Sequence, residues 1–267
     1  MKLSELNPYS SRNLLPKIKA QIAEEASHRL IVHPEGDMVQ RHLSVGSTFC
    51  RAVVSMGYLT QDQMNHAALR YRLGMSRDGG VIFWQIGHFK HMYDGKIMYY
   101  RPDCHRDHDH LPTWVMSELK NFYLKDHPDL IFELQSPHCL FGMHLLDDES
   151  MATMPVAVVE AEKTAVILSE IYSQFLWLAA GGMNELTPTK LFPLRGRKIT
   201  LFPDTDEEGL AYSNWYKICQ ESEKFLGQPI FISPLLEQSA SPSQKRRKID
   251  ILDYYFETIK PSLSIQK

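Results

Sequence analysis

Acidic side chains follow two apolar segments of the sequence, at the points where these segments end. Glu160 closes the run 155–160, PVAVVE, and Asp204 and Asp206 come after the run 198–203, KITLFP. Because ligands bind beyond the carboxyl ends of the strands in open α/β sheets, we expect these carboxylates to lie together. Mg²⁺ prefers oxygen ligands and takes a few carboxylates together with waters and substrate phosphates. The sequence therefore predicts a divalent-metal site.

The same acidic residues have an alternative use as helix caps, because Asp and Glu favour the N-terminal end of the helix dipole. For any one of them alone the cap is the commoner use, whereas all three in this order favour the metal site. Gly181 and Gly182 follow the run 175–180 and would let a phosphate or backbone come close. Lys163, one turn into the next helix, is either a phosphate contact or a solvated lysine.

The elements that must position these residues are four apolar runs that alternate with helical segments. This alternation is typical of βαβ units and predicts a four-stranded, mainly parallel sheet flanked by helices. Upstream, two glycine-bounded runs predict antiparallel strands, and helical spacing covers residues 13–30, 46–73 and 113–126. We therefore expect an N-terminal helical segment, a smaller α+β region, an α/β domain, and a polar linker with a closing helix, at 1–45, 46–150, 151–234 and 235–267.

Composition sets limits on the function. The chain has 267 residues, 43% of them hydrophobic and 23% charged, with a net charge of −3, so a folded protein is expected and bulk positive charge cannot hold nucleic acid. Four scattered cysteines indicate reduced thiols. The sequence contains no signal-peptide run and no apolar stretch of membrane-spanning length. We expect a soluble cytoplasmic protein with no membrane partner.

Three motifs resemble the Toprim domain of bacterial primases, topoisomerases and some nucleases. They are VAVVEAEKTAVIL, FLWLAAGGMNELTP and RGRKITLFPDTDEEG, within residues 155–232. That family has a Glu after its first strand, a Gly turn after the second and an Asp-x-Asp after the third. Upstream, GGVIFWQIG, DGKIMYY and LQSPHCLFGMHLL are similar to the α+β region that precedes Toprim in primases. The final KIDILDYYF resembles an acidic D-x-x-D segment that closes such proteins.

The resemblance implies a primase-like catalytic core of a mobile-element type, which acts in DNA replication. It implies that Asp204 and Asp206 hold Mg²⁺ or Mn²⁺ with phosphate oxygens, and that Glu160 is a ligand or general acid/base. Single-stranded DNA or RNA and nucleotides are the implied partners, with a helicase or other replication protein beside them. Ala161, Thr205 and Glu208 depart from the family pattern. A Toprim nuclease and a non-catalytic nucleic-acid- or partner-binding module stay open as alternatives to nucleotidyl transfer.

Three further features have two interpretations each. The loop CHRDHDH, with His105, His108 and His110, is either a flexible polar loop or a zinc, nucleotide or backbone ligand. The basic run KRRK at 245–248 is either a solvated linker or a phosphate-contacting patch. Aromatic residues of the predicted strands could stack on bases, although core packing is the commoner use; they are Trp84, Tyr99 and Tyr100.

Overall fold

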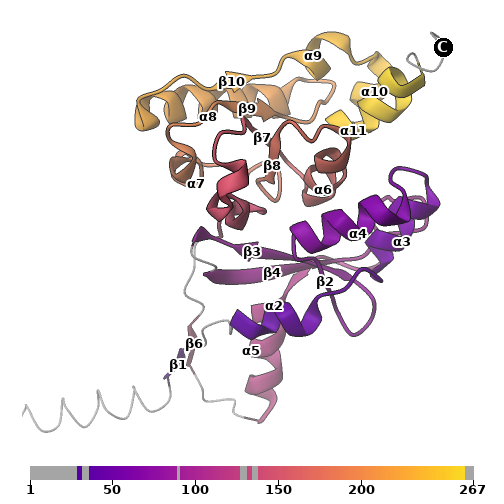
Figure 1. Ribbon diagram of the computed structural model, residues 1–267, viewed down its shortest axis with the longest axis vertical. Helices are drawn as coiled ribbons and strands as arrows, with labels where there is room; N and C mark the ends of the chain where they lie inside the picture. Colours follow the sequence, from indigo (N-terminus) through magenta and orange to yellow (C-terminus); the bar gives the residue numbers. More distant parts are fainter. Residues whose placement is uncertain (1–28, 32–35, 89–90, 127–130, 134–137, 262–267) are drawn as a thin grey trace, which may run out of the picture. The chain divides into compact units, whose positions relative to one another are not determined.

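The computed structural model describes residues 29–31, 36–88, 91–126, 131–133 and 138–261 (Figure 1). The chain divides into two compact units, the first formed by Met1–His33 with Met116–Ser136 and the second by Pro34–Val115 with Pro137–Lys267. The predicted helix 13–30 lies outside the described residues except at its end, where a strand is found instead. Within the described ranges, no helix is long and apolar enough to span a bilayer.

The first unit contains a two-stranded sheet and most of one helix. Strand β1 (Arg29–Ile31) pairs in parallel with β6 (Ile131–Glu133). Helix α5 spans Val115–Asp126, close to the predicted helix 113–126.

The second unit contains the predicted parallel sheet. Its order is β10-β9-β7-β8, and every neighbouring pair is parallel, so an α/β domain with a four-stranded parallel sheet is confirmed. The two central strands and β8 are buried or nearly so because apolar side chains occupy almost every position. The strands are β7 (Val156–Val159), β8 (Leu176–Ala179), β9 (Ile199–Phe202) and β10 (Phe231–Ile232).

Helices with clear start and stop signals connect these strands. Helix α7 (Pro188–Leu191) is capped by Thr187, whose side chain accepts from the Lys190 amide, and it continues into the 3-10 turn η4 (Phe192–Leu194). Helix α8 (Leu210–Leu226) ends at Gly227, whose φ of 68° is the left-handed conformation that glycine adopts without strain. Helix α6 (Glu162–Ile171) directly follows the β7 segment that carries Glu160.

An antiparallel sheet of order β2-β3-β4-β5 precedes this domain in the second unit, as the two predicted strands require. Thr60 caps helix α4, which precedes this sheet, in a capping box with Gln63. The elements are α2 (Gly36–His42), α3 (Thr48–Ser55), α4 (Gln61–Arg70), β2 (Gly74–Met75), β3 (Val81–Ile86), β4 (Met92–Met98), β5 (Thr113–Trp114), and the 3-10 turns η2 (Met143–Asp147) and η3 (Glu149–Met151).

One continuous apolar core joins the antiparallel sheet to the parallel one. Phe141 pairs its backbone with Ala179 of β8, and its ring stacks on Tyr71 at 5.2 Å and meets Phe83 of β3 at 5.4 Å. The Tyr71 hydroxyl donates to the Trp177 carbonyl at 2.8 Å. These contacts pack the antiparallel sheet against the α/β domain within one compact unit, so that side chains of both can form one site.

The prediction of a polar linker without helices at 236–248 is wrong. Two short helices lie there, α9 (Leu235–Ser239) and α10 (Pro242–Arg247). Ser241 and Gln244 form a capping box and Pro242 starts the helix, which outweighs the polar composition of the segment. The predicted closing helix is present as α11 (Ile251–Tyr254), extended by the π-helical turn η5 (Tyr255–Ile259).

Candidate functional site

Glu160 and Asp204 meet at the carboxyl edge of the parallel sheet. They follow β7 and β9, which are hydrogen-bonded neighbours with Val159 opposite Phe202. The Asp204 amide donates to Glu160 Oε1 at 3.2 Å, and the Glu160 side chain is buried, with 6% of the residue exposed. The sheet thus brings together two of the three carboxylates proposed from the sequence.

The environment of this pair disfavours two negative charges. Burial, with the nearby charges of Asp250 and Asp206, raises the pKa of Glu160 to about 7, against the opposing hydrogen bond from Asp204. Burial and the Glu160 charge raise the pKa of Asp204 well above its usual range. At neutral pH the pair therefore retains a proton that a bound cation would displace.

Asp206 is held differently. Its carboxylate accepts from the backbone amides of Glu208 at 3.0 Å, Leu210 at 3.1 Å and Ala211 at 2.8 Å, at the start of α8. Although some burial opposes ionisation, these hydrogen bonds keep the pKa of Asp206 below its ordinary value. The structure thus places Asp206 in a helix cap beside the Glu160–Asp204 pair, and its role as a metal ligand stays a prediction.

Substitutions of Asp206 separate these two roles. Asp206→Asn retains an oxygen acceptor for the α8 amides, whereas Asp206→Ala removes it. We expect Asp206→Ala to lower the free energy of unfolding by about 1 kcal/mol and Asp206→Asn to lower it by less. Denaturant unfolding measures this, and Mn²⁺ titration of both variants provides the second readout. If both variants lose Mn²⁺ affinity as completely as Asp204→Asn, Asp206 is a ligand rather than only a cap.

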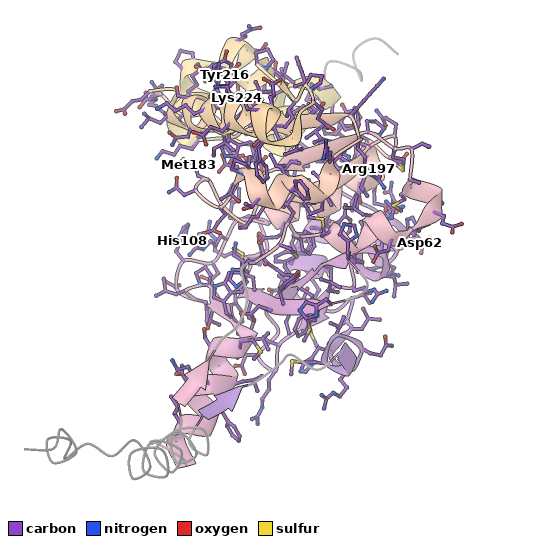
Figure 2. The ribbon with its side chains drawn as sticks, turned by 90° about the vertical axis from the view of Figure 1, so that its left-hand side faces the viewer. Asp62, His108, Met183, Arg197, Tyr216 and Lys224 are labelled. Carbon is purple, nitrogen blue, oxygen red and sulfur yellow. The ribbon has the colours of Figure 1, made fainter. Side chains whose placement is uncertain are left out.

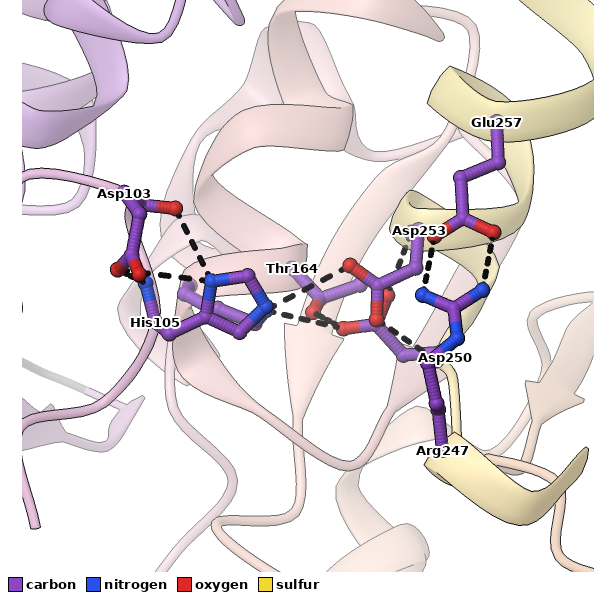
Figure 3. Close-up of polar contacts among 8 residues, drawn as sticks. Asp103, His105, Thr164, Arg247, Asp250, Asp253 and Glu257 are labelled. Atoms are coloured by element: carbon purple, nitrogen blue, oxygen red, sulfur yellow. Dashed lines mark hydrogen bonds and ion pairs between the residues drawn. The ribbon is translucent and has the colours of Figure 1, made fainter. Parts of the chain in front are cut away.

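The C-terminal segment contributes two acidic residues that we did not assign to the site from sequence. Asp250 Oδ2 accepts from the Thr164 hydroxyl at 2.5 Å and lies 3.7 Å from Lys163 Nζ, while Asp253 Oδ1 lies 4.0 Å from that nitrogen (Figure 3). Asp250 is buried, with 5% exposed. The available signal was the D-x-x-D of KIDILDYYF, which does not by itself tell where the segment folds back.

Lys163 therefore has carboxylate partners of its own. Burial opposes its charge, but Asp250 and Asp253 outweigh that effect and raise the pKa of Lys163 above its ordinary value. Its side chain is 19% exposed. Lys163 thus connects α6 to the C-terminal helices, and its contact with a phosphate stays a prediction.

Gly181 and Gly182 lie beside the carboxylates, after β8. Gly181 has a φ of 96°, and its carbonyl accepts from Lys96 Nζ at 2.8 Å. Lys96 comes from β4 of the antiparallel sheet and also contacts both carboxylate oxygens of Glu162, at 3.1 and 3.3 Å. A buried ion pair between β4 and helix α6 thus holds the Gly181 turn, in which only glycine is unstrained.

These groups line a single cavity of about 670 Å³, within the range of about 300–1,000 Å³ that small-molecule sites occupy. Its walls combine acidic, basic and aromatic side chains from both sheets and from the C-terminal segment. The charged and aromatic lining residues are Tyr58, Lys96, Tyr100, Arg101, His105, Arg106, His108, Glu160, Glu162, Lys163, Asp204, Arg247, Lys248, Asp253, Phe256 and Glu257.

The histidine-rich loop is ordered by its own carboxylates. Asp103 accepts from the His105 amide at 3.0 Å, and Asp107 Oδ2 lies 2.8 Å from His110 Nδ1. Burial raises the pKa of Cys104 to about 12, which disfavours the thiolate that zinc needs. In the ranges that the structure describes, no three His, Cys, Asp or Glu side chains form a metal-binding group, and this applies to the loop and to the carboxylate edge alike.

The basic run belongs largely to α10 and is mostly ion-paired. Arg247 contacts both oxygens of Glu257, at 2.7 and 2.6 Å, and Lys245 contacts Glu237 at 2.8 Å. Among the aromatic residues, Trp84 and Tyr100 are buried in the core, and Tyr99 stacks on His110 at 4.6 Å. Base stacking by Trp84 therefore has no exposed surface to use.

The donor set fits a hard cation in one respect and is incomplete in another. The buried Glu160 and the half-buried Asp204 supply carboxylate oxygens with raised pKa values, and Mg²⁺ is commonly held by one or two carboxylates with substrate phosphates. In the part of the chain that the structure describes, no group of three His, Cys, Asp or Glu side chains could hold a metal. Glu160 and Asp204 could therefore hold Mg²⁺ or Mn²⁺ with water or substrate oxygens at the remaining positions.

Fold and site define an α/β protein with a carboxylate pair at the edge of its parallel sheet. The chain belongs to the family described as "Domain of unknown function (DUF6371)", whose model matches residues 47–205, more than half of the sequence. The match spans the antiparallel sheet, the histidine-rich loop, Glu160 and Asp204. Comparison with curated proteins and with solved structures found no match.

Proposed function

We propose that the protein is a Toprim-type, divalent-metal-dependent enzyme that carries out primase-like nucleotidyl transfer on single-stranded DNA. The observation that carries this proposal is the Glu160–Asp204 pair, in contact at the carboxyl ends of two neighbouring parallel strands. Burial, and secondarily the neighbouring carboxylates, raise the pKa values of both groups, and a bound cation would favour their ionised forms. The small-molecule size of the cavity supports a nucleotide as one substrate.

Each group of the site then has a part in the proposed activity. Glu160 and Asp204 would hold Mg²⁺ or Mn²⁺, which supplies positive charge that stabilises phosphoryl transfer. Lys96 fixes the Gly181 turn, which leaves room beside the carboxylates for substrate. A helicase or other replication protein as partner, and single-stranded nucleic acid as template, belong to the same proposal.

One observation favours a second candidate, a non-catalytic nucleic-acid-binding module. The capping bonds of Asp206 leave the site with two free carboxylates rather than three. A site with fewer ligands could bind a nucleotide or strand without turnover. A Toprim nuclease uses the same carboxylates and is separated from both candidates by its products.

The test incubates the full chain with a single-stranded DNA template, labelled nucleoside triphosphates and Mg²⁺ or Mn²⁺, and resolves the products by size. Short new strands that disappear in Glu160→Gln and Asp204→Asn support the proposal. Glu221→Gln, an exposed position on α8 outside the cavity, is the matched control and should retain activity. Template degradation would indicate the nuclease, and strand binding without either product would indicate the non-catalytic module.

A further inference from the structure

The cations that line the cavity differ in whether they have a partner. Lys96 contacts Glu162, Lys163 contacts Asp250, and Arg247 contacts Glu257. Arg101, at the start of the histidine-rich loop, lies 3.2 Å from Asp103. Arg106 is the exception on this loop, because no carboxylate of the described residues lies within ion-pairing distance of it.

Arg106 is also the site of an unsatisfied donor. Its Nε is buried and has no hydrogen-bond partner among the described residues, although the residue as a whole is half-buried and lines the cavity. A buried donor without a partner is costly and is uncommon in folded proteins. The two terminal nitrogens of Arg106 are not among these buried atoms and make no hydrogen bond with the described residues, so they are the groups that an anionic ligand in the cavity would reach.

The loop holds Arg106 in place with its own hydrogen bonds. Tyr100 and Arg106 form an antiparallel bridge, the Asp107 amide donates to the Tyr99 carbonyl at 2.9 Å, and the Arg101 amide donates to the His105 carbonyl at 2.9 Å. Cys104, at the tip, is buried in the core with a φ of 60°. A backbone anchored at both flanks and at the tip presents Arg106 without the entropy cost of ordering a free loop.

The neighbours of Arg106 suit a phosphate. His105 and His108 of the same loop line the same cavity, and His108, labelled in Figure 2, is exposed. Imidazole N–H groups donate hydrogen bonds, and guanidinium binds phosphate oxygens with two parallel bonds. Glu160 and Asp204 line this cavity as well, so a phosphate on Arg106 would share the cavity with the proposed metal ligands.

We propose that Arg106, assisted by His105 and His108, binds a phosphate group of the substrate independently of any metal ion. This inference rests on the proposed function for the identity of the substrate, but its binding step requires neither metal nor turnover. The phosphate belongs either to a nucleoside triphosphate or to the backbone of a single strand. Both share the chemistry that a guanidinium recognises.

The test measures binding of ATP and of a fluorescent oligothymidylate to the full chain in EDTA at low salt. We expect Arg106→Ala to weaken binding by about tenfold or more, in line with the loss of a charge-assisted bidentate contact. Arg77→Ala is the matched control, because Arg77 is exposed and lies outside the cavity, and it should bind as the wild type does. Tighter binding of ATP identifies the triphosphate, and tighter binding of the oligomer identifies the strand.

Two results would overturn the inference: no binding of either probe by the wild type in EDTA, or equal affinities of the wild type and Arg106→Ala. If the alanine variant does not fold, Arg106→Lys replaces it. Lysine retains the charge without the paired donors, so we expect it to weaken binding by a smaller factor than alanine does. Glu160→Gln should bind ATP in EDTA at least as well as the wild type, since a negative group is removed. The two proposals can fail separately. If the protein binds ATP or the oligomer through Arg106 but synthesises no strand with metal present, the proposed function is rejected and this inference stands.

Discussion

Glu160→Gln is expected to make the metal-free protein more stable at pH 8, by about 3 kcal/mol. The reason is that burial raises the pKa of Glu160 from an ordinary value of 4.5 to about 7, so ionising this carboxyl in the folded state costs about 1.4 kcal/mol for each pKa unit. The glutamine has no charge to bury and retains an oxygen that accepts from the Asp204 amide. The wild type thus gives up stability for a charge that the proposed metal site would use, a trade-off common at binding sites.

The sign of the effect depends on pH. Below about pH 4.5 the carboxyl is protonated in both folded and unfolded chains, and the two proteins should differ little. Between 4.5 and 7 the unfolded chain ionises first, so wild-type stability falls relative to the variant as pH rises, and above 7 the full difference is present. Urea unfolding at pH 4.5, 6 and 8 in EDTA measures this dependence.

Added Mn²⁺ should reverse the difference at pH 8. It binds the folded wild type and stabilises it by mass action, whereas Glu160→Gln lacks one of the two proposed ligands. Glu221→Gln is the control and should follow the wild type at every pH. If the free energies of unfolding of the wild type and Glu160→Gln change with pH in the same way, the pKa of Glu160 is not raised in the folded protein.

Lys163→Met is expected to lower the free energy of unfolding by about 3–5 kcal/mol. Lys163 is the cation that faces both Asp250 and Asp253, and its removal leaves buried negative charge without a partner (Figure 3). Methionine retains most of the side-chain volume, so that the measured effect reports the charge. Denaturant unfolding measures the loss, and protease cleavage within 249–261 reports release of the C-terminal segment.

Lys190→Met is the matched control for this substitution. Lys190 contacts Glu185 at 3.0 Å, but that glutamate is 55% exposed, so the pair should contribute less than about 1 kcal/mol. Asp250→Asn combined with Lys163→Met should recover part of the loss, since it removes one of the stranded charges. If Lys163→Met costs no more than Lys190→Met, the C-terminal segment is held by apolar packing alone.

The parallel sheet and its carboxylate pair were predictable because local patterns determine them. Four apolar runs alternate with helical segments, and Glu160 and Asp204 each follow one of these runs. Their contact also requires β7 and β9 to be adjacent in the sheet, as the strand order shows.

The remaining features of the site depend on geometry that sequence spacing does not contain. Asp206 is two residues from Asp204, yet the path of the chain into α8 turns its carboxylate onto backbone amides. Asp250 reaches Thr164 across 86 positions, through packing of the C-terminal helices. Arg106 differs from Arg101 only in the arrangement of the loop around it. By contrast, the helix at 242–247 had a readable signal, the capping box with proline.

The most direct test of the account is a crystal of the full chain soaked with Mn²⁺, with anomalous scattering measured for the metal. The account predicts a peak bonded to the carboxylate oxygens of both Glu160 and Asp204, and no peak in Glu160→Gln. The account is contradicted if no peak lies between these two residues at a pH above 7 and at Mn²⁺ concentrations that saturate ordinary carboxylate sites.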